Sequence, residues 1–249
     1  NFDIGGATAF TAIGYQAAGG NEGTAISGQD ITVVGANAGK MMQQAPHRTT
    51  LFGASAGAAL NVGLENTFIG ALAGYSLTTA DRNVFLGTYA GYATVDVDNA
   101  VIIGYKAGYA NMTSGADGTI AIGYEAGLAI TSGARNTVIG YQSAKNNATG
   151  TDGTFVGYQS GLNVLLNNNT GVGAYTFQKI GTTGGGGAGE GNTALGALAM
   201  SGGDDTVANN TAKNNVAVGY ATLGGATKSS DGAAFTANSS VAIGYQALT

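Results

Sequence analysis

The sequence predicts an all-β protein, a parallel β-solenoid in which short strands stack coil upon coil. Three observations in the 249-residue chain favour this fold. A motif centred on glycine recurs along the whole length, a short apolar stretch precedes each central glycine, and the commonest spacing between these glycines is 17 residues. That spacing is too short for a helix pair or a propeller blade, but it suits one coil of a solenoid.

The repeat becomes visible when Asn136–Ala144 is laid over Ser240–Leu248. The residue before the central glycine is Ile, Val, Leu or Phe in every copy, and the residue three after it is Ala, Ser or Thr. Tyr follows the glycine directly in seven copies, and a second Gly lies four residues after it in seven. The fourteen central glycines are Gly5, Gly14, Gly35, Gly53, Gly70, Gly87, Gly104, Gly123, Gly140, Gly157, Gly173, Gly196, Gly219 and Gly244.

The residue types of the motif explain each part of the predicted coil. The stretch before the glycine is rich in Thr, Val and Ile, which favour a strand. The glycine is expected at a sharp structural turn, where a side chain would clash or where φ must be positive. The small residue three positions later suits a tight interior. Asn and Asp between copies, as in Asn167–Asn169, suit turns with left-handed backbone.

The whole chain, 1–249, is predicted to form a single repeat solenoid with three stretches of different regularity. Coils are irregular over 1–65, keep close to 17 residues over 66–173, and carry long insertions over 174–249. Loops of varying length should therefore protrude from the last stretch.

The outer face of the predicted strands is apolar and is expected to be buried against another surface. Neighbouring strand residues point to opposite faces, yet the two residues before the glycine are both apolar in nearly every copy. Ordering one coil costs roughly 25 kcal/mol at ~1.5 per residue. Matching that cost needs about 1,000 Å² of apolar burial at ~25 cal/mol/Å². One coil is too thin to supply this area, so we expect a homo-oligomer around the solenoid axis, most simply a homotrimer.

Composition excludes several classes of protein. The chain has no Cys, one His and one Pro, which argues against zinc sites, iron–sulfur clusters, disulfide scaffolds and collagen. A net charge of −5 argues against nucleic-acid binding. There is no apolar run of the length that crosses a membrane, so no membrane insertion is expected from this segment.

The motif Asn/Ser-Thr/Val-Ala-Ile-Gly-Tyr-Gln-Ala-Leu resembles the repeats of bacterial and phage fibre proteins. It is similar to the YadA-like head repeats of trimeric autotransporter adhesins and to phage tail-fibre-like surface proteins. The resemblance covers residues 3–249. It implies a left-handed parallel β-roll, three chains per fibre, and an adhesive role outside the cell or on a virion. The period here is longer and less regular than in those adhesin heads.

Candidate functional residues are few. Lys40, His47 and Arg48 lie in the most basic stretch and form a candidate contact loop. The GxGxxG pattern within 184–191 follows no strand and is expected to be a loop. Asp96–Asn99 and Asp204–Asp205 lack calcium-loop spacing and are expected to be solvated turns. The repeated tyrosines are expected to pack between coils or subunits, with an exposed sugar-binding ladder as the alternative. No catalytic residue, cofactor or metal site is expected, so the chain is not predicted to be an enzyme.

The sequence therefore predicts a structural and adhesive segment of an extracellular fibre, with a cell-surface receptor or glycan as its partner. A self-assembling extracellular filament subunit is one alternative, because the ends of a solenoid are open strand edges. An ice-binding solenoid is another. Its basis is the column three residues before the central glycine, which is interrupted by Val and Ile. The threonines of this column include Thr11, Thr50, Thr67, Thr137, Thr154, Thr170 and Thr193.

Overall fold

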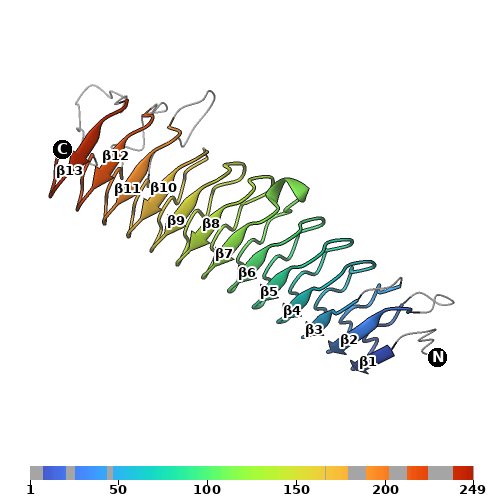
Figure 1. The fold of residues 1–249 in the computed structure, drawn as a ribbon. Coiled ribbons are helices and arrows are strands. Elements are labelled where there is room, and N and C mark those ends of the chain that lie inside the picture. The colour runs from blue at the N-terminus through green and yellow to red at the C-terminus, as the bar shows by residue number, and fades with distance from the viewer. Residues whose placement is uncertain are drawn as a thin grey trace. The chain divides into compact units, whose positions relative to one another are not determined.

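The computed structural model confirms an all-β parallel β-solenoid (Figure 1). It describes residues 8–20, 26–43, 47–165, 167–178, 189–201, 212–223 and 238–248. The chain forms two compact units, 1–122 and 123–249, which are described separately below. The three-part division by coil regularity follows from sequence spacing and stays a prediction.

Among the described residues of the first unit, seven parallel strands lie side by side in chain order. A 3-10 turn, η1 (Ser114–Ala116), lies in the longer coil before the last of these strands. The strands are β1 (Thr8–Ile13), β2 (Gln29–Val34), β3 (Thr50–Phe52), β4 (Thr67–Ile69), β5 (Val84–Leu86), β6 (Val101–Ile103) and β7 (Ile120–Ile122).

The described part of the second unit repeats the arrangement with six strands, again parallel and in chain order. They are β8 (Thr137–Ile139), β9 (Thr154–Val156), β10 (Thr170–Val172), β11 (Thr193–Leu195), β12 (Val216–Val218) and β13 (Val241–Ile243). In both units the register aligns equivalent motif positions. Thr50 pairs with Thr67, and Val216 pairs with Val241 across a much longer connection. Insertions therefore leave the register of the strands unchanged.

The core of each coil is built mainly from two motif positions, whose side chains stack on their equivalents in neighbouring coils. The residue two before the central glycine points inward, as in Phe68 and Ile102, and is fully buried. The small residue three after the glycine is also buried, as in Ala73 and Ser143. Larger side chains from the turn, such as Leu77, complete the interior. Each coil therefore has one narrow apolar core that continues into the next coil.

The central glycine forms a corner directly after the strand. From Gly14 to Gly244 the described corners have φ between +121° and +139°, which L side chains rarely adopt. At Gly70 an added Cβ would lie 2.6 Å from the backbone carbonyl of Gly87 in the next coil. Conformation and close stacking thus both require glycine at this corner. Gly5 lies outside the described residues.

Candidate interaction surfaces

Each coil presents a sheet face, formed by the outward strand residues one and three before the corner glycine. The strands β3 to β13 each have three residues, and none of these residues is charged. Inward residues such as Phe85 are buried, whereas the outward Leu86 is 41% exposed. The threonine column lies on this face too, with Thr137, Thr154 and Thr170 in register. The sheet face is therefore a continuous uncharged surface within each unit.

The tyrosine edge, defined as the residues one to five after the corner glycine, carries aromatic rows. In the first unit Tyr75, Tyr92 and Tyr109 stack with ring centroids 5.3 and 5.1 Å apart. Tyr89 lies edge-on to Tyr92, and the Lys106 ammonium lies 5.6 Å from the Tyr109 ring centre. These rings form one polar-aromatic cluster beside a cation.

The second unit has its own row on this edge. Tyr124, Tyr141 and Tyr158 stack with centroids 4.9 and 5.3 Å apart and nearly parallel planes. Tyr175 lies edge-on to Tyr158, and partial burial raises the pKa of its hydroxyl. Because the stacked rings cover one another's faces, the row offers ring edges rather than ring faces to a ligand. The tyrosines of this row therefore pack against one another between coils.

A chain of amide and charged groups runs beside this second tyrosine row. Gln159 donates to the side-chain oxygen of Gln142 at 2.8 Å, and Gln142 donates to the Glu125 carboxylate at 2.9 Å. Lys145 Nζ lies 2.7 Å from the same carboxylate. The hydrogen bond from Lys145 is the main reason that the pKa of Glu125 lies below its ordinary value.

The polar edge comprises the residues four to six before the corner glycine, and its innermost column is a ladder of buried asparagines. Asn83 donates from its side chain to Asn66 Oδ1 and to the Val97 carbonyl, while its own Oδ1 accepts from the backbone of Ala100. Asn192 and Asn215 repeat the pattern in the second unit. Sequence reasoning missed this ladder, although Asn recurs four residues before the corner glycine.

An outer column of the same edge joins coils through carboxylates. Asp81 accepts from the backbone of Leu64, Asp98 from Asp81, and Asp117 from Asp98. The segment Asp96–Asn99, expected to be a solvated turn, therefore contains Asp98, one of the carboxylates that join the coils. Across the described residues no group of three or more His, Cys, Asp or Glu could hold a metal ion. Asp204–Asp205 lies outside the described residues, as does most of the glycine-rich stretch at 184–191.

Exposed ion pairs also link neighbouring coils on the polar edge. Arg135 donates two hydrogen bonds to Asp152, at 2.6 and 2.9 Å. The hydrogen bonds hold the pKa of the Asp152 carboxyl below its ordinary value and raise that of Arg135. Both side chains are exposed, so the pair fixes side-chain positions more than it stabilises the fold.

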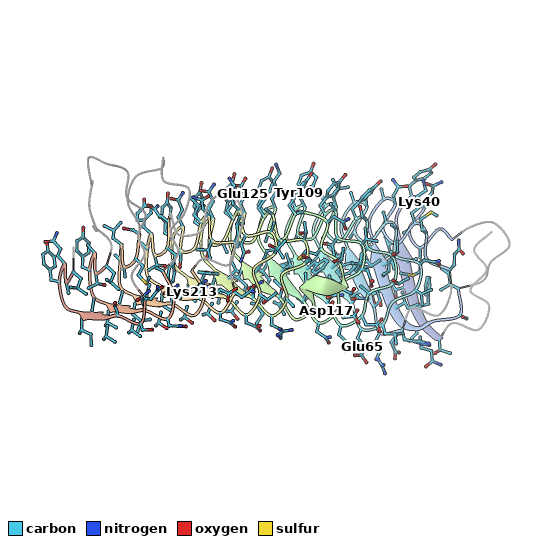
Figure 2. The ribbon with its side chains drawn as sticks, turned by 90° about the horizontal axis from the view of Figure 1, so that it is seen from above. Lys40, Glu65, Tyr109, Asp117, Glu125 and Lys213 are labelled. Atoms are coloured by element: carbon cyan, nitrogen blue, oxygen red, sulfur yellow. The ribbon has the colours of Figure 1, made fainter. Side chains whose placement is uncertain are left out.

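The residues of the candidate contact loop do not come together. Lys40 lies with Tyr109 on the tyrosine edge of the first unit, opposite the edge of Glu65 (Figure 2). Arg48 binds that Glu65 at 2.6 Å, and His47 Nδ1 accepts from the backbone of Gln29 at 3.1 Å. His47 and Arg48 thus belong to the polar edge, and Lys40 is separated from them by the width of the coil. Residues 44–46 lie outside the described residues.

No family model, curated protein or solved structure matches this chain. Within the part of the chain that the structure describes, there is no helix long and apolar enough to cross a membrane.

Proposed function

We propose that this chain is a segment of a homotrimeric extracellular fibre, in which the sheet faces of three copies pack around a common axis. The observation that carries the proposal is the sheet face. Its outward column includes Phe52, Ile69 and Leu86 in consecutive coils, each at least 38% exposed in the single chain. Large uncharged apolar surfaces of this kind mark interaction sites in soluble proteins.

A second copy fits this face better than an unrelated ligand does. Equivalent residues repeat at every coil, so the face has the same chemistry along its length, and a copy of the chain offers a matching periodic surface. Three copies, left-handed winding and adhesion come from the resemblance to adhesin heads. In such a fibre the tyrosine and polar edges stay outside in three copies, and weak contacts to a receptor or glycan add by multivalency.

The mass of the purified chain in solution tests the trimer. We expect three times the mass of one chain by analytical ultracentrifugation. The double variant Ile69→Lys/Leu86→Lys places charges on the sheet face and should yield monomers. Val95→Lys is the control, because Val95 is an apolar residue as exposed as Ile69 but lies between β5 and β6, outside the sheet face. A monomeric wild-type chain, or equal effects of both substitutions, would overturn the trimer.

The adhesive part has a separate test. The chain is applied to an array of glycans and immobilised surface proteins, alongside a Tyr92→Ala/Tyr109→Ala variant. Binding that the variant weakens supports adhesion through the tyrosine edge. A trimer that binds nothing on the array overturns the adhesive role and leaves a structural shaft.

A further inference from the structure

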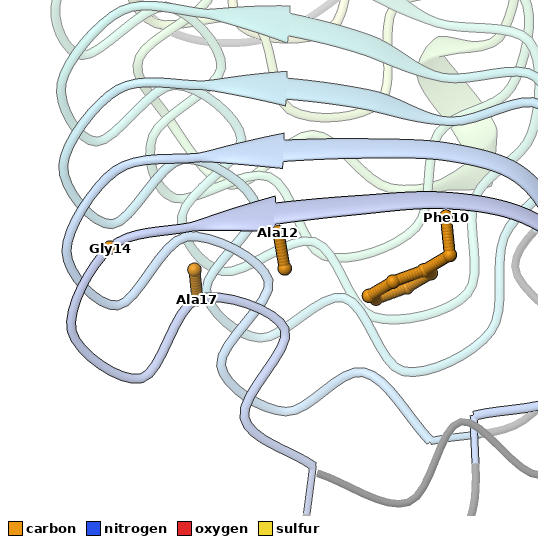
Figure 3. A pocket seen from close by; sticks show the side chains of 4 residues that line it. All are labelled: Phe10, Ala12, Gly14 and Ala17. Carbon is orange, nitrogen blue, oxygen red and sulfur yellow. The ribbon is translucent and has the colours of Figure 1, made fainter.

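The tyrosines are the main groups that this protein presents for one-electron chemistry. The chain contains twelve Tyr but no Cys and no Trp. A pocket of about 300 Å³ in the first unit has apolar walls, formed by Phe10, Ala12, Gly14 and Ala17 (Figure 3). Such walls hold no titratable or nucleophilic group. The reactive feature to consider is therefore the tyrosine edge and not this pocket.

Three tyrosines of the second unit stand in a regular row, one in each of three consecutive coils. The rings of Tyr124 and Tyr141 have centroids 4.9 Å apart and planes 9° apart, and Tyr158 continues the row with its centroid 5.3 Å from that of Tyr141. Each of these side chains is between 40% and 45% exposed. An oxidant in solution can therefore reach every ring, and a ring that loses an electron has another phenol directly beside it.

Backbone hydrogen bonds hold the coils that carry this row at a fixed spacing. Gln142 N–H donates to the Tyr124 carbonyl at 2.8 Å, and Gln159 N–H donates to the Tyr141 carbonyl at 2.9 Å. Equivalent residues of adjacent parallel strands lie about 4.8 Å apart. The half-exposed rings can turn about their side-chain torsions while this backbone spacing stays unchanged. The ring carbons next to the two hydroxyls can therefore meet without separating the coils.

Tyr124 has a proton acceptor beside its hydroxyl. A phenol is protonated at neutral pH, and it becomes a strong acid when it loses an electron, so oxidation is easiest where a base takes the proton. Glu125, on the tyrosine edge of this unit (Figure 2), is such a base. Hydrogen bonds from Lys145, Gln142 and Tyr124, in that order of effect, lower the pKa of its carboxyl. The carboxylate therefore stays ionised and can take the proton of Tyr124.

We propose that Tyr124 and Tyr141 form an oxidative cross-linking site, at which a peroxidase-type oxidant joins the two rings as a dityrosine. Each phenol gives one electron to the oxidant and one proton to Glu125 or water, which leaves two phenoxyl radicals. A carbon–carbon bond forms between the ring carbons next to the two oxygens. Each of these carbons then passes its hydrogen, as a proton, to the oxygen of its own ring through water. The protein loses two electrons and two protons, and hydrogen peroxide is reduced to two molecules of water.

The product locks two adjacent coils together by a covalent bond. Because the chain contains no Cys, dityrosine supplies the link that a disulfide supplies in other proteins. Tyr124 and Tyr141 are one 17-residue coil apart, so the link closes a loop of that length in the unfolded chain. Cross-linked chains should therefore unfold at higher urea concentrations. The site lies on the tyrosine edge of a single chain and does not depend on the proposed trimer, whose contacts are on the sheet face.

Treatment of the purified full chain with a haem peroxidase and hydrogen peroxide tests the site. Trypsin cleavage after Arg135 and Lys145 separates Tyr124 from Tyr141. We expect dityrosine fluorescence, and a mass-spectrometric map in which these two peptides are joined with the loss of two hydrogen atoms. The treated chain should still migrate as one chain on a denaturing gel, because the link is internal.

Two variants distinguish the proposed pair from general oxidation. Tyr141→Phe keeps a ring in the stack but removes its phenol, and should abolish the joined peptides. Tyr175→Phe is the matched control, because Tyr175 lies on the same edge but meets Tyr158 edge-on, at 72°. This control should leave the yield of the link between Tyr124 and Tyr141 unchanged.

The row of the first unit is an internal control for the proton acceptor. Tyr92 and Tyr109 stack at 5.1 Å, but the group beside Tyr109 is the Lys106 ammonium, which takes no proton. We expect about tenfold less early product from this pair than from Tyr124 and Tyr141, a smaller factor than a buried general base contributes, because water also accepts protons at an exposed edge.

Glu125→Gln should remove the same advantage. This variant keeps the size of the side chain but cannot take the proton, and should slow formation of the link between Tyr124 and Tyr141 by about tenfold. Equal early yields in the two rows together with an unchanged rate in Glu125→Gln would overturn the part of Glu125. Absence of the joined peptides, or cross-links chiefly between different chains, would overturn the site itself, whatever mass the trimer test finds.

Discussion

The coils around β4 and β5 in the first unit and those around β10 to β12 in the second fill their cores from different positions of the repeat. In the first group the bulk comes from the strand, with Phe68 and Phe85 inward and a glycine four residues after each corner. In the second group the strand offers only Gly171, Ala194 and Ala217. There the bulk comes from the fourth residue after the corner, in Phe177, Met200 and Leu223.

This difference explains why the second glycine of the motif is not constant. A Cβ at Gly91 would lie 2.5 Å from Phe85 of the same coil, and a Cβ at Gly171 would lie 2.8 Å from Phe177. Phe177 nevertheless has φ of 53°, close to the 59° of Gly91. Left-handed backbone alone therefore does not require glycine at this position. The available volume decides which of the two positions carries the large side chain.

Removing the large side chain should be equally harmful in both groups. Phe68→Ala and Phe177→Ala each leave a cavity in a fully buried site, and we expect each to lower the free energy of unfolding by about 3–5 kcal/mol. Urea denaturation followed by circular dichroism measures the loss. A cost below about 1 kcal/mol for Phe177→Ala alone would show that the turn position does not fill the core.

Moving the large side chain from the strand position to the turn position tests whether the two positions share one volume in the core. Gly91→Leu alone should destabilise by about 1–3 kcal/mol, because it overpacks the site beside Phe85. Combined with Phe85→Ala, the same substitution should cost less than the sum of the two single effects, recovering about 2 kcal/mol. If the losses of unfolding free energy in the two single variants simply add in the double variant, residues 85 and 91 do not compete for one volume.

The smallest expected effect concerns Glu125 in the second unit. Its pKa is depressed, chiefly by the hydrogen bond from Lys145, so the carboxylate stabilises the fold above its unfolded pKa. That stabilisation is lost as the pH falls through the folded pKa. Lys145→Met should raise the pKa of Glu125 toward its ordinary value, as followed by NMR titration. Lys213→Met, on the opposite edge of the unit (Figure 2), serves as the control and should leave the titration unchanged.

The sequence identified the repeat unit, its strands and its parallel stacking, because the motif positions recur in fixed order. It did not identify the asparagine ladder. Asn between copies of the motif was expected in turns, whereas the structure buries Asn66 and Asn83 between coils. Nor did it separate Lys40 from Arg48, which are close in the chain but lie on opposite edges of the coil. Proximity in sequence says little about which edge a residue occupies when the chain turns several times within one coil.

The sequence by itself determined the spacing of the coils, since a glycine corner and a short apolar strand suffice to define one turn of a solenoid. The tertiary structure decided which side of the coil each residue faces. Gln142 and Arg135 bend the chain through left-handed conformations, with φ of 51° and 55°, although neither is a residue type typical of such turns. Stacking on neighbouring coils favours such conformations because it gives backbone groups their hydrogen-bond partners: Gln142 N–H, for example, donates to the Tyr124 carbonyl at 2.8 Å.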